Sequence, residues 1–244
     1  MRSVAANLLI CGDPEQAARE TAERFVCAGV RSVALRGVFN VAVPGGSSPR
    51  RAFELLATGG FVDLVPWTRT HVFFTDERCV PPDDIESNYR LAFDTLLSHV
   101  PAPKSNIHRF RGELEPDEAA ALYEHELRQA MGGPPRFDLV ILGMGQDTHT
   151  ASLFPNSPAL AEHFRLAAAN WIETLNAHRL TLTVPALSSA ESIIIMALGT
   201  EKAEAVRTAL QGEVNVEAHP VQAIRPDTGR LLWIVDQDAA SELA

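Results

Sequence analysis

An aspartate and a histidine, Asp147 and His149, stand two residues apart directly after a glycine-rich segment. An unperturbed imidazole ionises near neutral pH, so histidine suits proton transfer, and a neighbouring carboxylate can orient it. The preceding run FDLVIL predicts a buried strand over 137–142. Most isolated histidines are structural, but a position beside an acid after a strand end favours a catalytic role. We therefore expect Asp147 and His149 at a reacting centre.

Three charged residues, Asp76, Glu77 and Arg78, follow a second apolar run, HVFFT, which predicts a strand over 71–75. The arginine fork matches phosphate oxygens, and a carboxylate held among other groups can act as a base or position a hydroxyl. A solvated turn with a local salt bridge is the alternative explanation. Ser87-Asn88 could help to order this loop, although a plain helix cap explains the serine equally well.

The loop PGGSSP at 44–49 joins a short apolar strand over 38–43 to a helix that begins at its last proline. Gly45 and Gly46 let the backbone approach a ligand closely, and Ser47 offers a hydroxyl. Free amide groups at the start of a helix favour an anion. The loop has neither a G-x-G-x-x-G nor a Walker A pattern, so a nucleotide is not implied. A tight turn with a serine cap is the structural alternative.

Two further cations lie where strands and helices begin. Arg179 opens a predicted strand over 179–184, and Lys202 falls in the first turn of a predicted helix over 200–210. A basic side chain in a first turn opposes the helix dipole, so Lys202 is better placed to hold an anion than to stabilise its helix. A surface lysine without a ligand is the alternative.

Helical and strand patterns alternate along the chain, which predicts βαβ units and the α/β class. We expect one domain over 1–244, a three-layer αβα architecture with a mostly parallel sheet covered on both faces. Ligands in such sheets bind beyond the carboxyl ends of strands, where the loops above lie. The other expected helices cover 14–35, 87–99, 117–131 and a short C-terminal segment, and the other expected strands cover 166–171, 192–198 and 231–235.

The composition, 46% hydrophobic and 21% charged over 244 residues, is typical of a soluble protein, and no apolar stretch approaches the ~20 residues that span a bilayer. The N-terminus lacks the long apolar core of a secretory signal and the three cysteines show no paired spacing, so we expect a cytoplasmic protein. The net charge of −10 argues against nucleic-acid binding, and a site for an anion must therefore concentrate positive charge locally.

A metal at Asp147 and His149 would need further ligands, and residues 124–126 lack an H-E-x-x-H pattern, so no metal site is expected.

Together the motifs resemble the 6-phosphogluconolactonase family, in a superfamily with glucosamine-6-phosphate deaminase and the ribose-5-phosphate isomerase-like, Rossmann-like fold. They are PGGSSP at 44–49, TDERCVP at 75–81 with SN at 87–88, LGMGQDTHTASLFP at 142–155, RLTLT at 179–183, and GTEK at 199–202. A closing stretch from PVQAI to LLWIVD continues the match, and the resemblance covers about residues 38–240.

The resemblance implies hydrolysis of 6-phosphoglucono-δ-lactone to 6-phosphogluconate in the oxidative pentose phosphate pathway, by a monomer without a cofactor. It places Asp147 and His149 at the reacting end, where neutral His149 would take a proton from the attacking water. Asp76 is the rival base, because deaminases of the superfamily use an acidic residue in that loop. The resemblance also implies that the phosphate and nearby hydroxyls are held by Gly45, Gly46, Ser47, Arg78, Arg179 and Lys202.

Two positions depart from the family pattern. The usual Asp-Gly-His is Asp147-Thr148-His149 here. Because a β-branched residue is strained at positive φ, we expect Thr148 to adopt an ordinary backbone conformation. The family's Leu-Asn pair is Leu187-Ser188, which weakens any role for an amide at that position.

Two other functions stay open. A deaminase or isomerase on the same fold would act on a sugar phosphate, but deaminases carry an Asp-Gly-His-Ile-Ala-Phe-Asn-Glu stretch where this chain reads DTHTASLFPN. A sugar-phosphate-sensing regulator would need a DNA-reading segment, and the residues before the strand at 38–43 are not basic enough to suggest one. The chain has no G-x-S-x-G motif, so a serine esterase is not indicated.

Overall fold

The computed structural model describes residues 7–133 and 135–244, so residues 1–6 of the N-terminal stretch interpreted above lie outside it. The α-helices are α1 (Pro14–Arg36), α2 (Arg50–Leu56), α3 (Asn88–Ala92), α4 (Pro116–Met131), α5 (Val184–Ser188) and α6 (Ala203–Gln211). The strands are β1 (Asn7–Cys11), β2 (Phe39–Val43), β3 (Thr70–Phe74), β4 (Asp76–Arg78), β5 (Ile107–His108), β6 (Leu139–Gly143), β7 (Ala167–Ile172), β8 (Ala177–Leu182), β9 (Ser192–Ala197) and β10 (Arg230–Asp236). In the described part of the chain, no helix is both long enough and apolar enough to cross a membrane.

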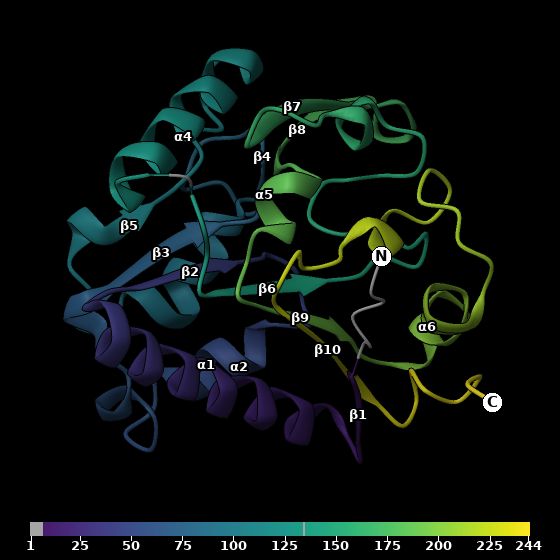
Figure 1. Ribbon diagram of the computed structural model, residues 1–244, viewed down its shortest axis with the longest axis horizontal. Coiled ribbons are helices and arrows are strands. Elements are labelled where there is room, and N and C mark those ends of the chain that lie inside the picture. The colour runs from purple at the N-terminus through teal and green to yellow at the C-terminus, as the bar shows by residue number, and fades with distance from the viewer. Residues whose placement is uncertain (1–6, 134) are drawn as a thin grey trace.

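Seven strands form one sheet in the order β1-β10-β9-β6-β2-β3-β5, and every neighbouring pair is parallel. Helices α1 and α2 cover one face, and α4 and α5 lie on the other (Figure 1). The four central strands are almost wholly buried, as expected of a parallel sheet with both faces covered. The predicted α/β class and mostly parallel sheet are confirmed.

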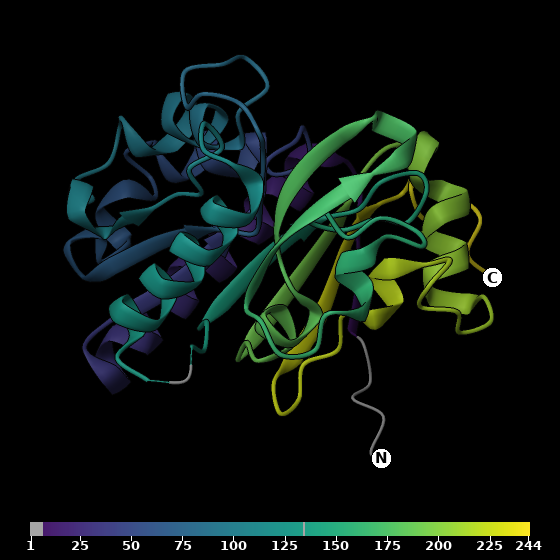
Figure 2. The same ribbon diagram turned by 90° about the horizontal axis from the view of Figure 1, so that it is seen from above.

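A smaller antiparallel sheet, in the order β4-β8-β7, accompanies the parallel one. It lies on the same side as α4 and α5, and the view from above shows β7 and β8 passing over the parallel strands (Figures 1 and 2). Residues of β7 and β8 were predicted to be strands, but their membership of a separate sheet was not. Strand β4 was missed because three charged residues have no strand pattern; pairing with β8 alone makes them extended.

Local capping signals mark the starts of α1 and α3 where the sequence predicts them, whereas α5 was not predicted. Asp13 caps α1, since its Oδ1 accepts a hydrogen bond from the Gln16 amide at 2.7 Å, and Gly37 ends that helix at φ 78°. Ser87 caps α3, which continues as a π-helical segment, Phe93–Leu97. The helix expected over 200–210 starts as a 3-10 turn before α6.

The predicted short C-terminal helix is wrong, because residues 237–242 form turns. The Asp236 carboxylate accepts from the Ala239 amide at 2.8 Å, and its carbonyl accepts from the Ala240 amide at 3.0 Å. So short a terminal segment gains too few hydrogen bonds to offset the free-energy cost of starting a helix. The edge strand β1, over NLLIC, was also not predicted.

Candidate active site

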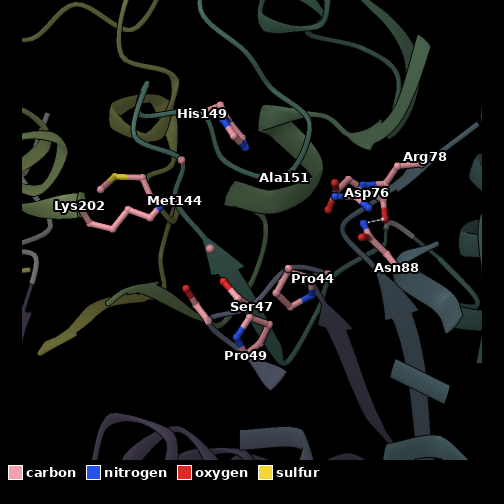
Figure 3. A pocket seen from close by; sticks show the side chains of 15 residues that line it. Pro44, Ser47, Pro49, Asp76, Arg78, Asn88, Met144, His149, Ala151 and Lys202 are labelled. Atoms are coloured by element: carbon pink, nitrogen blue, oxygen red, sulfur yellow. Dashed lines mark hydrogen bonds between the residues drawn. The ribbon is translucent and has the colours of Figure 1, made fainter. Parts of the chain in front are cut away.

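A pocket of about 190 Å³ opens at the carboxyl ends of β9, β6, β2 and β3, four adjacent strands of the parallel sheet (Figure 3). The chain continues from β2 to β3 on one side and from β6 towards β9 on the other. Ligands in open α/β sheets bind where the connections diverge in this way. The pocket is lined by Pro44, Gly45, Gly46, Ser47, Ser48, Pro49, Asp76, Arg78, Asn88, Gly143, Met144, Gly145, His149, Ala151 and Lys202.

Seven of the nine residues singled out from the sequence line this pocket; Asp147 and Arg179 do not. Asp147 contacts His149 from outside the lining, and Arg179 lies in β8 directly opposite Arg78. Asn88 lines the pocket as well, although its sequence position suggested only a loop-ordering role. The structure therefore gathers loops that are distant in sequence at one edge of the sheet.

The Asp147–His149 pair has the geometry of an oriented imidazole. Asp147 Oδ1 lies 2.5 Å from His149 Nδ1 and accepts a hydrogen bond from the His149 amide at 3.2 Å. Burial alone would raise the pKa of Asp147, but the hydrogen bond and charge of His149 outweigh it and lower that pKa below the usual value. An ionised Asp147 requires the ring proton on Nδ1, which leaves Nε2 as the free acceptor of a neutral ring.

Two neighbours hold this imidazole in place. Its ring stacks on Phe154 with centroids 4.2 Å apart. Gly145 lies so close that an added Cβ would stand 2.2 Å from His149 Nδ1 and 2.5 Å from Asp147 Oδ1. A side chain at position 145 would therefore displace the pair, which explains the glycine at this point of the loop.

The expectation of an ordinary backbone at Thr148 is wrong, because this residue has φ 64°. Its side chain is only 3% exposed, and Oγ1 donates to the Asp147 carbonyl at 2.6 Å. Its amide donates to the Gly145 carbonyl at 3.1 Å. The turn between Asp147 and His149 thus imposes the left-handed conformation, and local hydrogen bonds hold a β-branched residue in it.

Asp76 is buried at the pocket wall with both carboxylate oxygens occupied. Its Oδ1 accepts from Thr75 Oγ1 and its Oδ2 from Ser152 Oγ, each at 2.9 Å. The two hydroxyls orient the carboxylate and leave it room to accept a further hydrogen bond, such as one from a sugar hydroxyl. Ser152 was not singled out from the sequence, because its partner is 76 residues away.

Glu77 is buried beside Asp76 and ties β4 to the start of α3. Its carboxylate accepts hydrogen bonds from Ser87 Oγ and from the amides of Arg78, Asn88 and Tyr89, at 2.7–3.1 Å. Burial raises the pKa of Glu77 above the ordinary value, and the amide hydrogen bonds offset only part of that rise. Glu77 is thus a structural carboxylate that places Asn88 in the pocket.

Asn88 is only 2% exposed and reaches the pocket through a gap left by a glycine. Its Nδ2 donates to the Asp76 carbonyl at 3.0 Å. A Cβ added to Gly45 would stand 1.8 Å from Asn88 Oδ1, so any other residue at position 45 would displace this amide. Close packing against a side chain is therefore one reason for the Gly45-Gly46 pair, beside the φ of 85° at Gly46.

Positive charge and free amides face the pocket from several sides. Figure 3 shows Lys202 and Arg78 on opposite sides of it. Among the described residues, neither cation forms an ion pair with a carboxylate. Within the same part of the chain, no backbone hydrogen bond is donated by the amides of residues 45–48. The local charge that an anionic ligand needs is present in this acidic protein.

Arg179 places a further positive charge opposite Arg78, although it does not line the pocket. The two arginines are directly opposed across the β4–β8 pair, and like charges in that arrangement repel. Burial and the charge of Arg78 lower the pKa of Arg179. An anion near both guanidinium groups would relieve the repulsion.

Sequence comparison identifies the family. A family described as glucosamine-6-phosphate isomerases/6-phosphogluconolactonase matches residues 12–233. The chain belongs to this family. The resemblance seen in the separate motifs is thereby confirmed over almost the whole chain.

Two named relatives and one solved structure align over most of their length. The chain is 36% identical over 227 residues to the 6-phosphogluconolactonase of Synechocystis sp., an alignment that covers 90% of this chain and 92% of the relative. It is 35% identical over 254 residues to a probable chloroplastic 6-phosphogluconolactonase 3 of rice, Oryza sativa subsp. indica. That alignment covers 97% of this chain and 76% of the relative. The crystal structure of 6-phosphogluconolactonase from Thermotoga maritima has a TM-score of 0.82 at 27% identity and covers 95% of this chain and 100% of that one.

Proposed function

We propose that this protein hydrolyses 6-phospho-D-glucono-1,5-lactone to 6-phospho-D-gluconate, the lactonase step of the oxidative pentose phosphate pathway. The observation that carries the proposal is a histidine, oriented by a carboxylate, in the same small pocket as two cations without ion-pair partners among the described residues. The relatives named 6-phosphogluconolactonase support the same activity.

His149 is the proposed general base. Its free Nε2 removes a proton from a water molecule as the water oxygen attacks the lactone carbonyl carbon, and donors in the pocket stabilise the oxyanion. When the tetrahedral intermediate collapses, the bond from the carbonyl carbon to the ring oxygen breaks, and the proton on Nε2 passes to that oxygen. Asp147 stabilises the imidazolium that exists between these two proton transfers.

Asp76 is proposed to position a sugar hydroxyl rather than to act as the base. Both of its oxygens already accept hydrogen bonds from side-chain hydroxyls, whereas Nε2 of His149 has no such partner among the described residues. The phosphate and its neighbouring hydroxyls are assigned to the loop at Gly45, Gly46 and Ser47 and to the cations Arg78, Lys202 and Arg179.

The direct test follows disappearance of fresh lactone, made with glucose-6-phosphate dehydrogenase, at neutral pH with EDTA present. We expect acceleration well above spontaneous ring opening for the wild type and for His163→Gln, a matched control at an exposed histidine. We expect His149→Gln to lose ~10²–10⁴-fold in kcat, the usual contribution of a general base. Asp76→Asn should raise KM more than it lowers kcat.

The alternatives give different results in the same assay. Ammonia release from glucosamine 6-phosphate without lactone hydrolysis would favour the deaminase. Sugar-phosphate binding without turnover would favour the sensing domain. Equal hydrolysis of unphosphorylated gluconolactone would refute the phosphate site, and nearly full turnover by His149→Gln would refute the assigned base.

We also propose that the protein is a single-domain monomer of the cytoplasm. The proposed location is supported by the cysteines, since Cys11, Cys27 and Cys79 are all free thiols, as in proteins of reducing compartments. Light scattering coupled to size exclusion should give the mass of one chain, 26.5 kDa; a dimer mass would contradict the proposal.

A further inference from the structure

Thr148 joins the Asp147–His149 pair to a second loop of the molecule, residues 213–223. Its Oγ1 lies 3.2 Å from His219 Nδ1, and its carbonyl accepts from the Val221 amide at 3.1 Å. The residue is 3% exposed and has φ 64°, a conformation that glycine adopts without strain. The backbone conformation at position 148 therefore disfavours threonine. The hydrogen bonds of its side chain compensate for this strain.

The hydrogens of this contact can be assigned from chemistry. A threonine hydroxyl carries one hydrogen, and Thr148 Oγ1 donates it to the Asp147 carbonyl at 2.6 Å. Towards His219 the same oxygen can then only accept, so Nδ1 of His219 must carry a proton. The chain of hydrogen bonds runs from His219 through the Thr148 hydroxyl to the peptide that links Asp147 to Thr148.

The 213–223 loop is itself held firmly to the rest of the protein. Gln222 is 7% exposed; its Nε2 donates to the carbonyls of Thr208 and Glu213, both at 3.2 Å, and its Oε1 accepts from the Asn215 amide at 2.8 Å. A second link joins the loop to the segment after His149, because the Asn156 amide donates to the Glu217 carbonyl at 2.9 Å. His219 thus reaches Thr148 from an anchored position.

We propose that Thr148 and His219 form a clamp that positions His149 for proton transfer. The clamp rests on the proposed role of His149 as general base. By fixing the Asp147–Thr148 peptide, it fixes the direction of the Asp147 carboxylate and of the imidazole bonded to it. Thr148 and His219 are positioning residues, since neither lines the pocket.

Kinetics of a small set of variants test the clamp. In Thr148→Gly and His219→Ala we expect kcat to fall about tenfold with KM changed less than about twofold, because misplacing a base slows proton transfer without weakening substrate binding. The double variant should be no slower than the slower single variant, since both changes break one interaction. Thr148→Ser and His219→Asn keep the hydroxyl and a donor near Nδ1, so they should restore most of kcat.

Controls separate the clamp from folding and from the proposed function. His163→Ala removes an exposed histidine and should leave kcat unchanged. If Thr148→Gly does not fold, the kcat values of the His219 variants alone test the clamp. The clamp is refuted if His219→Ala keeps wild-type kcat, if His219→Asn is no faster than His219→Ala, or if the two single effects multiply in the double variant. Should His149→Gln also keep its turnover, the base assignment fails instead.

Discussion

The hydrogen bond between Asp147 and His149 decides which ring nitrogen is free for chemistry. Asp147 Oδ1 stands 2.5 Å from Nδ1, and His149 lowers the pKa of Asp147 despite partial burial. A depressed aspartate pKa means that the pair's contribution to stability is present above the ordinary aspartate value and is lost as pH falls through the lowered value. The carboxylate therefore stays ionised at any pH where a neutral imidazole could act as a base.

Asp147→Asn tests this orientation. An amide can turn its NH₂ towards Nδ1 and so favour the tautomer with the proton on Nε2, which cannot accept a proton from water. We expect kcat to fall ~10²–10⁴-fold, because the ring nitrogen that should accept the proton from water then carries a proton itself. Asp63→Asn, an exposed control in the 3-10 turn Val62–Leu64, should leave kcat unchanged. A wild-type kcat in Asp147→Asn would contradict the orienting role.

Some single-residue features could be predicted from sequence and others could not. Residue type and position after a strand were enough to predict that His149 and Arg78 lie at the pocket. The φ of 64° at Thr148 was missed, because threonine normally avoids that region and only the contacts of the folded turn maintain it. The contact of Ser152 with Asp76 spans 76 positions of sequence and leaves no local pattern.

The buried carboxylate of Glu77 joins two elements, β4 and α3, and so shapes one wall of the pocket. Glu77→Gln replaces one acceptor oxygen by an amide donor, which faces hydrogen-bond donors that have lost their partner. We expect the free energy of unfolding to fall by about 2–4 kcal/mol, measured by urea denaturation. Glu86→Gln, exposed in the loop between β4 and α3, is the control and should stay within about 0.5 kcal/mol of wild type. A Glu77→Gln protein as stable as the control would show that the carboxylate is dispensable.

Elements with strong local signals were predictable, and those formed by distant pairing were not. The caps Asp13 and Ser87 and the apolar runs of the central strands mark their elements in sequence. Strand β4 exists because Asp76 pairs with Thr181 and Arg78 with Arg179, about 100 positions away. The small sheet that brings Arg179 opposite Arg78 therefore could not be predicted from local sequence patterns.

The protein as a whole is acidic, but basic side chains are concentrated at its pocket. The chain carries a net charge of −10, yet Arg78 and Lys202 face the pocket and Arg179 stands opposite Arg78. Parallel strands deliver these loops to one edge because their carboxyl ends all point the same way, so the α/β pattern alone predicted where the site lies. Nearby carboxylates such as Asp76 offset part of the repulsion between Arg78 and Arg179, and a bound anion would offset more of it.

Binding of a phosphorylated sugar acid should therefore raise the melting temperature of the whole protein. A ligand at 100 times its Kd stabilises by about 2.7 kcal/mol, which corresponds to roughly 5–10 °C for a chain of this size. We expect this shift with 6-phosphogluconate and little shift with gluconate at the same ionic strength, measured by scanning calorimetry. Arg78→Gln should reduce the shift, whereas Arg207→Gln, which removes an exposed arginine paired with Glu242, should leave it intact. An equal shift with gluconate would mean that the pocket recognises the sugar acid rather than its phosphate. A loss of the shift in both variants would mean that net charge, not the arrangement at β4 and β8, attracts the ligand.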